Sequence, residues 1–190
     1  MTKVLLIDPA MAPVAERFRQ LLPAPVEVGA LAGFDDDEFA RLAADADVLV
    51  NARRPIDATT LMLAPKARFV QLIGAGHDTV DVAAAAAAGV MVSYNPGANS
   101  AGVAEQTVML MLALLKRLPA SERATRDGGF PTGEIVALGI GDLAETTVGI
   151  VGLGAIGQAV AERLAPFGPR LLYTSRTRRG VEIETRLGVA

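Results

Sequence analysis

The residues with the clearest chemical potential in this sequence form a glycine-rich run, Gly152-Leu153-Gly154-Ala155-Ile156-Gly157. Nineteen glycines in 190 residues make this GxGxxG spacing weak by itself, but an apolar segment, 148–151, runs straight into it. In such a turn Gly152 makes the bend, Gly154 lets a pyrophosphate approach the backbone, and Gly157 allows close helix–strand packing. A following helix adds unpaired N–H groups and partial positive charge. The run therefore predicts a dinucleotide-binding turn, and the alternative is a merely glycine-rich connection.

A second segment, five residues after the next expected strand begins, bears on which dinucleotide is bound. It reads Ser175-Arg176-Thr177-Arg178-Arg179, and no acid appears until Glu182. NAD sites usually carry an acid here for the ribose hydroxyls, and a carboxylate would repel a 2′-phosphate. Ser175 can donate to that phosphate and Arg176 can pair with it through two hydrogen bonds. The segment favours NADP over NAD, and a solvated basic loop is the alternative.

These turns need parallel sheets to position them, and the sequence predicts one in its first half. Apolar runs predict five strands, and Ala-rich amphipathic stretches predict the helices between them. Strands are expected at 3–8, 26–28, 47–51, 69–73 and 90–93, and helices at 13–22, 35–44, 57–63 and 81–88. Such alternation is typical of an α/β fold, here a flavodoxin-like parallel sheet covered on both faces.

The second half predicts the first part of a Rossmann dinucleotide-binding domain. A helix from 99 or 100 to 118 is apolar on all sides, so we expect it to be buried between elements. Strands at 147–151 and 170–174 and helices at 155–165 and 181–187 follow a glycine-dotted loop at 128–141. Domains are expected at 1–98 and 99–190. A doubly wound fold has about six strands, so the second domain is expected to be truncated.

Composition excludes several other classes of protein. The chain has no cysteine, which excludes disulfides and thiolate metal sites, and we expect no metal. A net charge of −3 and 4% aromatic residues argue against nucleic-acid partners. The longest apolar run, 107–115, covers about half of the roughly 20 residues that cross a bilayer. We expect no membrane partner and a cytoplasmic location.

Several ordered segments together resemble the D-isomer-specific 2-hydroxyacid dehydrogenases. They are residues 74–81 (GAGHDTVD), 95–99 (NPGAN), 103–105 (VAE) and 148–157 (VGIVGLGAIG). The Ser175-Arg176 pair resembles the NADP-preferring glyoxylate and hydroxypyruvate reductase branch. The resemblance implies an oxidoreductase that acts on the CH–OH group of small D-2-hydroxy acids, or reduces 2-oxo acids such as glyoxylate or hydroxypyruvate. It also implies a homodimer.

The resemblance assigns binding roles in the first half of the chain. It places the turn containing Ala75 and Gly76 where backbone amides face the substrate carboxylate, and bare N–H groups at a strand end do suit an anion. An ordinary strand–helix turn is the alternative. Thr107 resembles a position that approaches the cofactor, although a helical Thr can equally bond its own backbone. Arg53 and Arg54 could approach an anionic substrate, but solvated surface charges are favoured.

No residue of this chain is assigned a catalytic role. The family's chemistry uses an Arg, a Glu and a His that the resemblance places beyond Ala190. The single histidine, His77, does not match that His and is interpreted as a turn residue. We therefore expect the 190-residue chain to be partial, inactive and a poor cofactor binder. The alternative is a non-catalytic protein on the same scaffold that senses a dinucleotide or binds a partner.

Overall fold

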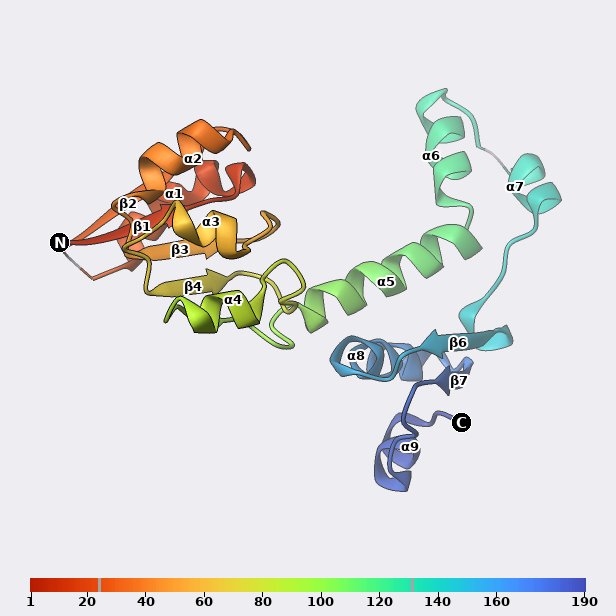
Figure 1. Ribbon diagram of the computed structural model, residues 1–190. Helices are drawn as coiled ribbons and strands as arrows, with labels where there is room; N and C mark the ends of the chain where they lie inside the picture. Colours follow the sequence, from red (N-terminus) through yellow and green to blue (C-terminus); the bar gives the residue numbers. More distant parts are fainter. Residues whose placement is uncertain (24, 131) are drawn as a thin grey trace. The chain divides into compact units, whose positions relative to one another are not determined.

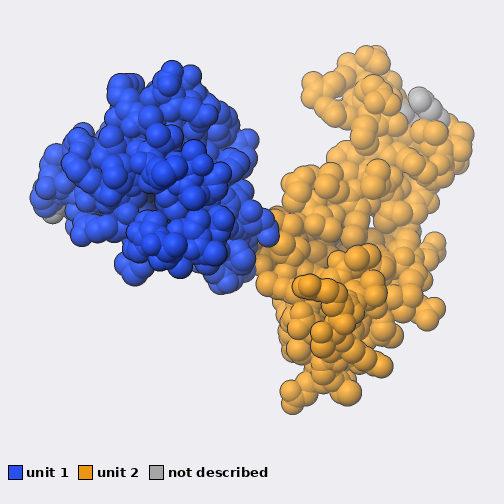
Figure 2. All heavy atoms as spheres, in the orientation of Figure 1, with its two compact units in different colours: residues 1–98 blue, residues 99–190 orange. Residues whose placement is uncertain are grey.

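The computed structural model describes residues 1–23, 25–130 and 132–190. The chain separates into two compact units, Met1–Ala98 and Asn99–Ala190 (Figure 2). Each unit has its own hydrophobic core, so each is described by itself.

A five-stranded parallel sheet forms the centre of the first unit (Figure 1, red to yellow). Its strand order is β2-β1-β3-β4-β5, so β1 is an interior strand. From β1 the chain adds β2 on one side, and it then adds β3, β4 and β5 in turn on the other side, with all strands parallel. The strands are β1 (Thr2–Leu6), β2 (Val26–Ala30), β3 (Val48–Asn51), β4 (Phe69–Leu72) and β5 (Met91–Ser93). This topology confirms the predicted flavodoxin-like α/β sheet.

Aspartates begin three of the helices that connect these strands. Asp35, Asp57 and Asp81 each accept a hydrogen bond from the backbone N–H three residues later, at 2.7–2.9 Å. They satisfy amides that a helix N-terminus leaves without a partner. The helices that they cap are α2 (Asp36–Ala43), α3 (Ala58–Met62) and α4 (Val82–Ala87).

The first predicted helix, 13–22, differs from the structure. A 3-10 helix, η1 (Pro9–Val14), precedes α1 (Ala15–Leu21). Asp8 accepts a hydrogen bond from the N–H of Ala10 at 3.0 Å, which starts the helical turn four residues earlier than expected. Pro13 lies inside η1 and has no N–H to donate, and α1 begins two residues later.

The two faces of the sheet are covered by different helices. Leu5, Leu49 and Val70 point to the face covered by α2, α3 and α4, where Phe39 and Ala85 are fully buried. Alternate residues of β1, β2 and β3 point to the opposite face, where η1 and α1 cover them. Burial on both faces explains why these strands read as continuous apolar runs.

The second unit is built around two parallel strands, β6 (Thr147–Val151) and β7 (Arg170–Thr174), joined through α8 (Ala155–Leu164). The remaining elements are α5 (Ser100–Leu115), α6 (Leu118–Arg126), α7 (Thr132–Leu138), η2 (Leu143–Glu145), η3 (Ala165–Phe167) and α9 (Val181–Leu187). Helix α7 lies where an irregular loop was expected. Val189 pairs in parallel with Leu171 on the outer edge of β7.

Helix α5 is less buried within its unit than its sequence predicts. It packs along α8 through Ala104 and Val108, which are both buried. Its other apolar side chains include Met109, Leu110 and Leu114, which are 49%, 50% and 71% exposed. The expectation of burial on all sides is therefore wrong for this unit as far as the chain is described, because the α5 side chains away from α8 are exposed.

Candidate functional site

The glycine-rich turn connects β6 to α8 and depends on two of its glycines for its shape. Gly152 has φ = +95°, a backbone conformation that L side chains rarely adopt. Its N–H donates to the carbonyl oxygen of Thr174 at 2.7 Å, which ties the end of β6 to the end of β7. A Cβ at Gly157 would lie 2.1 Å from the carbonyl oxygen of Gly152, so only glycine allows this close approach of helix and turn.

The amides at the start of α8 are directed away from the helix. Gly154 stands immediately before α8 and has space around it, since a Cβ there would meet no atom within 4 Å. The first helical hydrogen bond runs from the N–H of Gln158 to the carbonyl of Gly154 at 2.9 Å. The N–H groups of the first turn, including those of Ala155 and Ile156, have no partner within the helix. They form a concentration of donors and positive potential suited to a phosphate.

The carbonyl of Leu153 joins this turn to the segment after β7. The Leu153 side chain is fully buried, which fixes the middle of the turn to the core of the unit. Its carbonyl oxygen accepts hydrogen bonds from Gln158 Nε2 at 3.3 Å and from Arg179 Nε at 2.9 Å. The Arg179 guanidinium therefore lies directly beside the glycine turn.

A cavity of about 510 Å³ lies between the glycine turn and the segment after β7. It is lined by Val151, Gly152, Leu153, Gly154, Thr174, Ser175, Arg176, Thr177 and Arg179. Arg176 and Arg179 are the charged residues in this lining, and no acid is among them. Arg176 is exposed and makes no hydrogen bond or ion pair with the described part of the chain. The structure thus brings both predicted segments to one positively charged cavity.

The Ser175 hydroxyl, predicted as a donor to the 2′-phosphate, makes a hydrogen bond within its own loop. Its hydroxyl donates to the carbonyl oxygen of Thr177 at 2.6 Å. The hydroxyl must rotate before it can donate to a phosphate, although its oxygen remains free to accept.

Glu184 was missed by sequence reasoning. This buried carboxylate on α9 accepts hydrogen bonds from Arg178 Nε at 2.8 Å, Arg178 Nη2 at 3.0 Å and the Tyr173 hydroxyl at 2.6 Å. The Arg178 guanidinium, with help from the Tyr173 hydroxyl, lowers the pKa of Glu184 from 4.5 to about 2. The carboxylate is ionised at neutral pH and neutralises Arg178. A polar residue on the buried face of α9 is the sequence signal that could have identified it.

In the first unit, Ala75 and Gly76 lie in a turn after β4. Three backbone hydrogen bonds fix its surroundings: Asn95 donates to Gly74 at 3.1 Å, Val80 to His77 at 2.9 Å, and Ile56 to Thr79 at 2.8 Å. Within the described residues, the amides of Ala75 and Gly76 have no hydrogen-bond partner. They stand at the carboxyl edge of a parallel sheet, where such groups can receive an anion.

His77 lies in the same turn and stacks edge-on against Tyr94. Their ring centroids are 5.3 Å apart at an interplanar angle of 72°. His77 is exposed and Tyr94 is 41% exposed. This packing agrees with the interpretation of His77 as a turn residue.

Both arginines after β3 are ion-paired, but only Arg54 is buried, so the expectation of a solvated surface charge is wrong for Arg54, whereas the Arg53 side chain is 64% exposed. Arg53 donates to both oxygens of the fully buried Asp8, at 2.9 and 2.8 Å, and thereby lowers the pKa of that carboxyl. Arg54 is itself buried, pairs with Asp36 and lies 4.3 Å from the ring centroid of Phe39. Asp8 and Arg53 are 45 positions apart, and nothing in their local sequence predicts the pairing.

Thr107 follows the second of its two predicted alternatives. Its hydroxyl donates to the carbonyl oxygen of Val103, one helical turn earlier in α5, at 2.7 Å. Thr107 is not among the residues that line the cavity beside the glycine turn. The structure therefore does not bring Thr107 together with the other predicted cofactor-binding residues.

Residues 1–23, 25–130 and 132–190 contain neither a candidate metal site nor a candidate membrane-spanning helix. Among them, no group of three or more His, Cys, Asp and Glu side chains is arranged to hold a metal ion. No helix in these ranges has the length and apolar character that crossing a membrane requires.

Comparison with known proteins identifies the family. The family described as D-isomer specific 2-hydroxyacid dehydrogenase, catalytic domain, matches residues 4–189. D-3-phosphoglycerate dehydrogenase of Mycobacterium bovis is 38% identical over 144 residues, which are 75% of this chain and 27% of that protein. Glyoxylate reductase of Korarchaeum cryptofilum is 37% identical over 147 residues, covering 76% of this chain and 44% of that one.

A solved structure shows a similar fold. NAD-dependent formate dehydrogenase of Staphylococcus aureus, in complex with NAD, superposes with a TM-score of 0.71 at 27% identity. The match covers 90% of this chain and 56% of that one. The chain thus spans less than half the length of the two curated relatives and somewhat more than half of the solved one.

The parallel-sheet unit and the glycine turn after β6 are typical of the α/β class of dinucleotide-binding proteins. The chain belongs to the D-isomer specific 2-hydroxyacid dehydrogenase family.

Proposed function

We propose that this protein binds NADP(H) at the cavity beside the glycine turn and reduces a small 2-oxo acid, such as glyoxylate or hydroxypyruvate. The observation that carries the proposal is the acid-free lining of that cavity, with Arg176 and Arg179 as its charged residues. The nicotinamide supplies a hydride to C2 of the substrate when the cofactor is bound. The residues of this chain hold and orient the cofactor.

The charge of the cavity lining supports the proposed preference for NADP(H). The backbone N–H groups at the start of α8 can donate hydrogen bonds to the pyrophosphate, which NAD and NADP share. The additional 2′-phosphate of NADP brings further negative charge, and the free guanidinium of Arg176 can pair with it. Ser175 can contribute its hydroxyl after rotating away from Thr177. The acid that would serve the ribose hydroxyls of NAD is absent from this lining.

The substrate carboxylate is proposed to bind in the first unit, at the turn after β4. The amides of Ala75 and Gly76 support this role, because they have no hydrogen-bond partner in the described structure and lie at the carboxyl edge of the sheet, where Ala75 is half-buried and Gly76 exposed. The similarity to a glyoxylate reductase favours a small substrate. We also propose a cytoplasmic location for the protein.

A homodimer is the proposed assembly. Its support is the uncovered apolar side of α5, where Met109, Leu110 and Leu114 are about half exposed or more. Contiguous exposed apolar side chains on one element commonly mark an interface between proteins. Size-exclusion chromatography with light scattering on the full gene product tests this, and a monomeric mass overturns it.

The decisive experiment compares cofactors in the full gene product. Oxidation of NADPH and NADH is followed by absorbance with glyoxylate and with hydroxypyruvate, in the wild type and in Arg176→Ala. We expect NADPH to be preferred, and Arg176→Ala to raise the KM for NADPH at least tenfold while changing that for NADH less than threefold.

Arg170→Ala is the matched control, since Arg170 is an exposed arginine at the opposite end of β7. It should leave both KM values unchanged. A preference for NADH, or equal effects of Arg176→Ala on both cofactors, would overturn the NADP assignment. Binding of NADPH with no turnover of any 2-oxo acid would instead favour the non-catalytic, dinucleotide-sensing alternative.

A further inference from the structure

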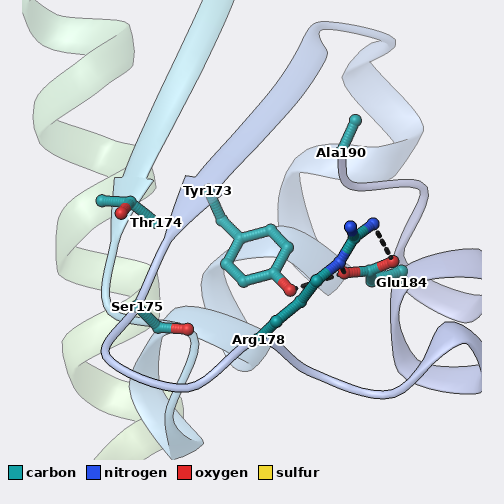
Figure 3. A pocket seen from close by; sticks show the side chains of 6 residues that line it. All are labelled: Tyr173, Thr174, Ser175, Arg178, Glu184 and Ala190. Atoms are coloured by element: carbon teal, nitrogen blue, oxygen red, sulfur yellow. Dashed lines mark hydrogen bonds and ion pairs between the residues drawn. The ribbon is translucent and has the colours of Figure 1, made fainter.

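A second cavity lies on the other side of the segment that follows β7, and it contains the buried carboxylate of Glu184 (Figure 3). The cavity measures about 320 Å³. Thr174 and Ser175 line this cavity and also the one beside the glycine turn, so the start of the segment forms a wall between them. Contacts that fix Thr174 and Ser175 in the Glu184 cavity therefore also fix one side of the proposed cofactor cavity.

Hydrogen bonds run from Glu184 across this wall to the glycine turn. Glu184 accepts from the Tyr173 hydroxyl at 2.6 Å, and the same hydroxyl oxygen accepts from the backbone N–H of Arg179 at 2.9 Å. Arg179 Nε then donates to the carbonyl oxygen of Leu153 at 2.9 Å. Every link in this chain joins a named donor to a named acceptor, and its two ends are 31 residues apart in the sequence.

The same carboxylate controls how much free positive charge the segment presents. Arg178 donates two hydrogen bonds to Glu184, and Figure 3 shows the guanidinium turned to that carboxylate. Arg179 donates to the carbonyl oxygen of Leu153, whereas Arg176 has no hydrogen-bond or ion-pair partner in the described structure. A carboxylate is required for this arrangement, because a neutral amide would leave Arg178 without its counter-charge.

We propose that Glu184, through Tyr173 and Arg178, is the positioning residue that fixes the segment 175–179 so that Arg176 can select the 2′-phosphate. This inference rests on the proposed NADP preference and assigns the residue that maintains it. Glu184 is not among the residues that line the cavity beside the glycine turn. Its effect is transmitted by the hydrogen bonds that begin at its two oxygens.

The first test examines the segment without any cofactor. Trypsin cleaves after arginine, and the Arg178 side chain, although 80% exposed, is held by two hydrogen bonds to Glu184. In the full gene product, Glu184→Gln should accelerate cleavage after Arg178 at least fivefold, measured by mass spectrometry of the fragments. Glu182→Gln is the matched control, because Glu182 is exposed on the same helix. It should cleave at the wild-type rate.

The second test measures selectivity by calorimetric titration with NADPH and NADH. We expect Glu184→Gln to raise the Kd for NADPH five- to tenfold and that for NADH less than twofold. In the Arg176→Ala background, Glu184→Gln should add no further loss of NADPH affinity, since the two residues act on the same phosphate. Tyr173→Phe interrupts the same hydrogen-bond chain and replaces Glu184→Gln if that variant does not fold.

The outcomes separate this inference from the proposed function. Unchanged cleavage and unchanged Kd values in Glu184→Gln overturn the positioning role. Equal weakening of both cofactors also overturns it, because that result indicates a general structural role. If Arg176→Ala leaves the preference for NADPH intact, the proposed function fails, and faster cleavage in Glu184→Gln then shows that the segment is fixed for another purpose.

Discussion

Replacement of Gly157 by alanine tests most directly how the glycine turn is built. A Cβ at this position would lie 2.1 Å from the carbonyl oxygen of Gly152, whereas real Cβ atoms keep at least 3.0 Å. The turn and α8 must therefore separate by about 0.9 Å. The obstacle is backbone, and rotation of a side chain cannot relieve it. The same Cβ would also press on Ile150 Cγ2 at 3.2 Å.

Two opposing effects set the magnitude. Alanine in a helix is favoured over glycine by about 1 kcal/mol, whereas overpacking of a tight contact costs about 1–3 kcal/mol. A backbone obstacle places the cost near the upper end of that range, so we expect a net loss of about 1–2 kcal/mol. Displacement of Gly152 also strains its 2.7 Å hydrogen bond to Thr174. The Kd for NADPH should rise at least tenfold.

Urea unfolding followed by circular dichroism measures the stability, and calorimetric titration measures the Kd. Gly102→Ala is the matched control, because Gly102 also lies in a helix but a Cβ there meets nothing within 4 Å. It should stabilise the protein by roughly 0.5–1 kcal/mol. If Gly157→Ala stabilises the protein as much as the control and binds NADPH normally, the reasoning from the close contact is refuted.

Three further substitutions have distinct expected results. Gly154→Ala should change the free energy of unfolding by less than about 0.5 kcal/mol, because a Cβ there has open space. It should nevertheless weaken NADPH binding at least tenfold, because the Cβ would occupy the space through which the pyrophosphate approaches the backbone. Normal NADPH binding would contradict the proposed position of the cofactor. Asp81→Ala should lose about 1 kcal/mol in urea unfolding, since Asp81 accepts from the N–H of Ala84 at 2.9 Å, and no loss would contradict its role as a cap. The pKa of Glu184 is lowered from 4.5 to about 2 by Arg178 and Tyr173, so its contribution to stability is present above pH 4.5 and is lost as the pH falls toward 2. The urea midpoint of Glu184→Gln should therefore fall less steeply than that of the wild type over this interval, and parallel curves would contradict the pairing.

Local patterns made much of the fold predictable. The predicted bounds of β6 and β7 agree with the structure, because an apolar run ends at Gly152 in one case and at Ser175 in the other. Asp57 and Asp81 also begin helices as predicted. Each of these features depends on residues within a few positions of one another, which is the range over which a sequence pattern can be interpreted directly.

Features that depend on distant residues were not predictable in this way. The pairing of Arg53 with Asp8 requires β1 and β3 to lie side by side before either side chain finds its partner. Helix α5 shows the same limit, since its composition indicates apolar surroundings but not which of its faces α8 will cover. In the candidate site, the glycine turn was recognisable as a motif, whereas Glu184 becomes meaningful only when α9 returns to β7.

The carbonyl oxygen of Leu153 has a consequence for redesign of the protein. It accepts hydrogen bonds from Gln158, at the start of α8, and from Arg179, so α8 and the segment after β7 share one acceptor in the glycine turn. An acidic residue introduced at position 175 to favour NADH would stand near Arg176 and Arg179, and either guanidinium could neutralise it. Conversion of the cofactor preference therefore calls for exchange of the whole segment 175–179, and the incoming sequence must also supply a donor to Leu153. A replacement segment without this donor would leave the Leu153 carbonyl without its bond to position 179 and would change how the glycine turn binds the diphosphate, although no residue of the glycine motif had been changed.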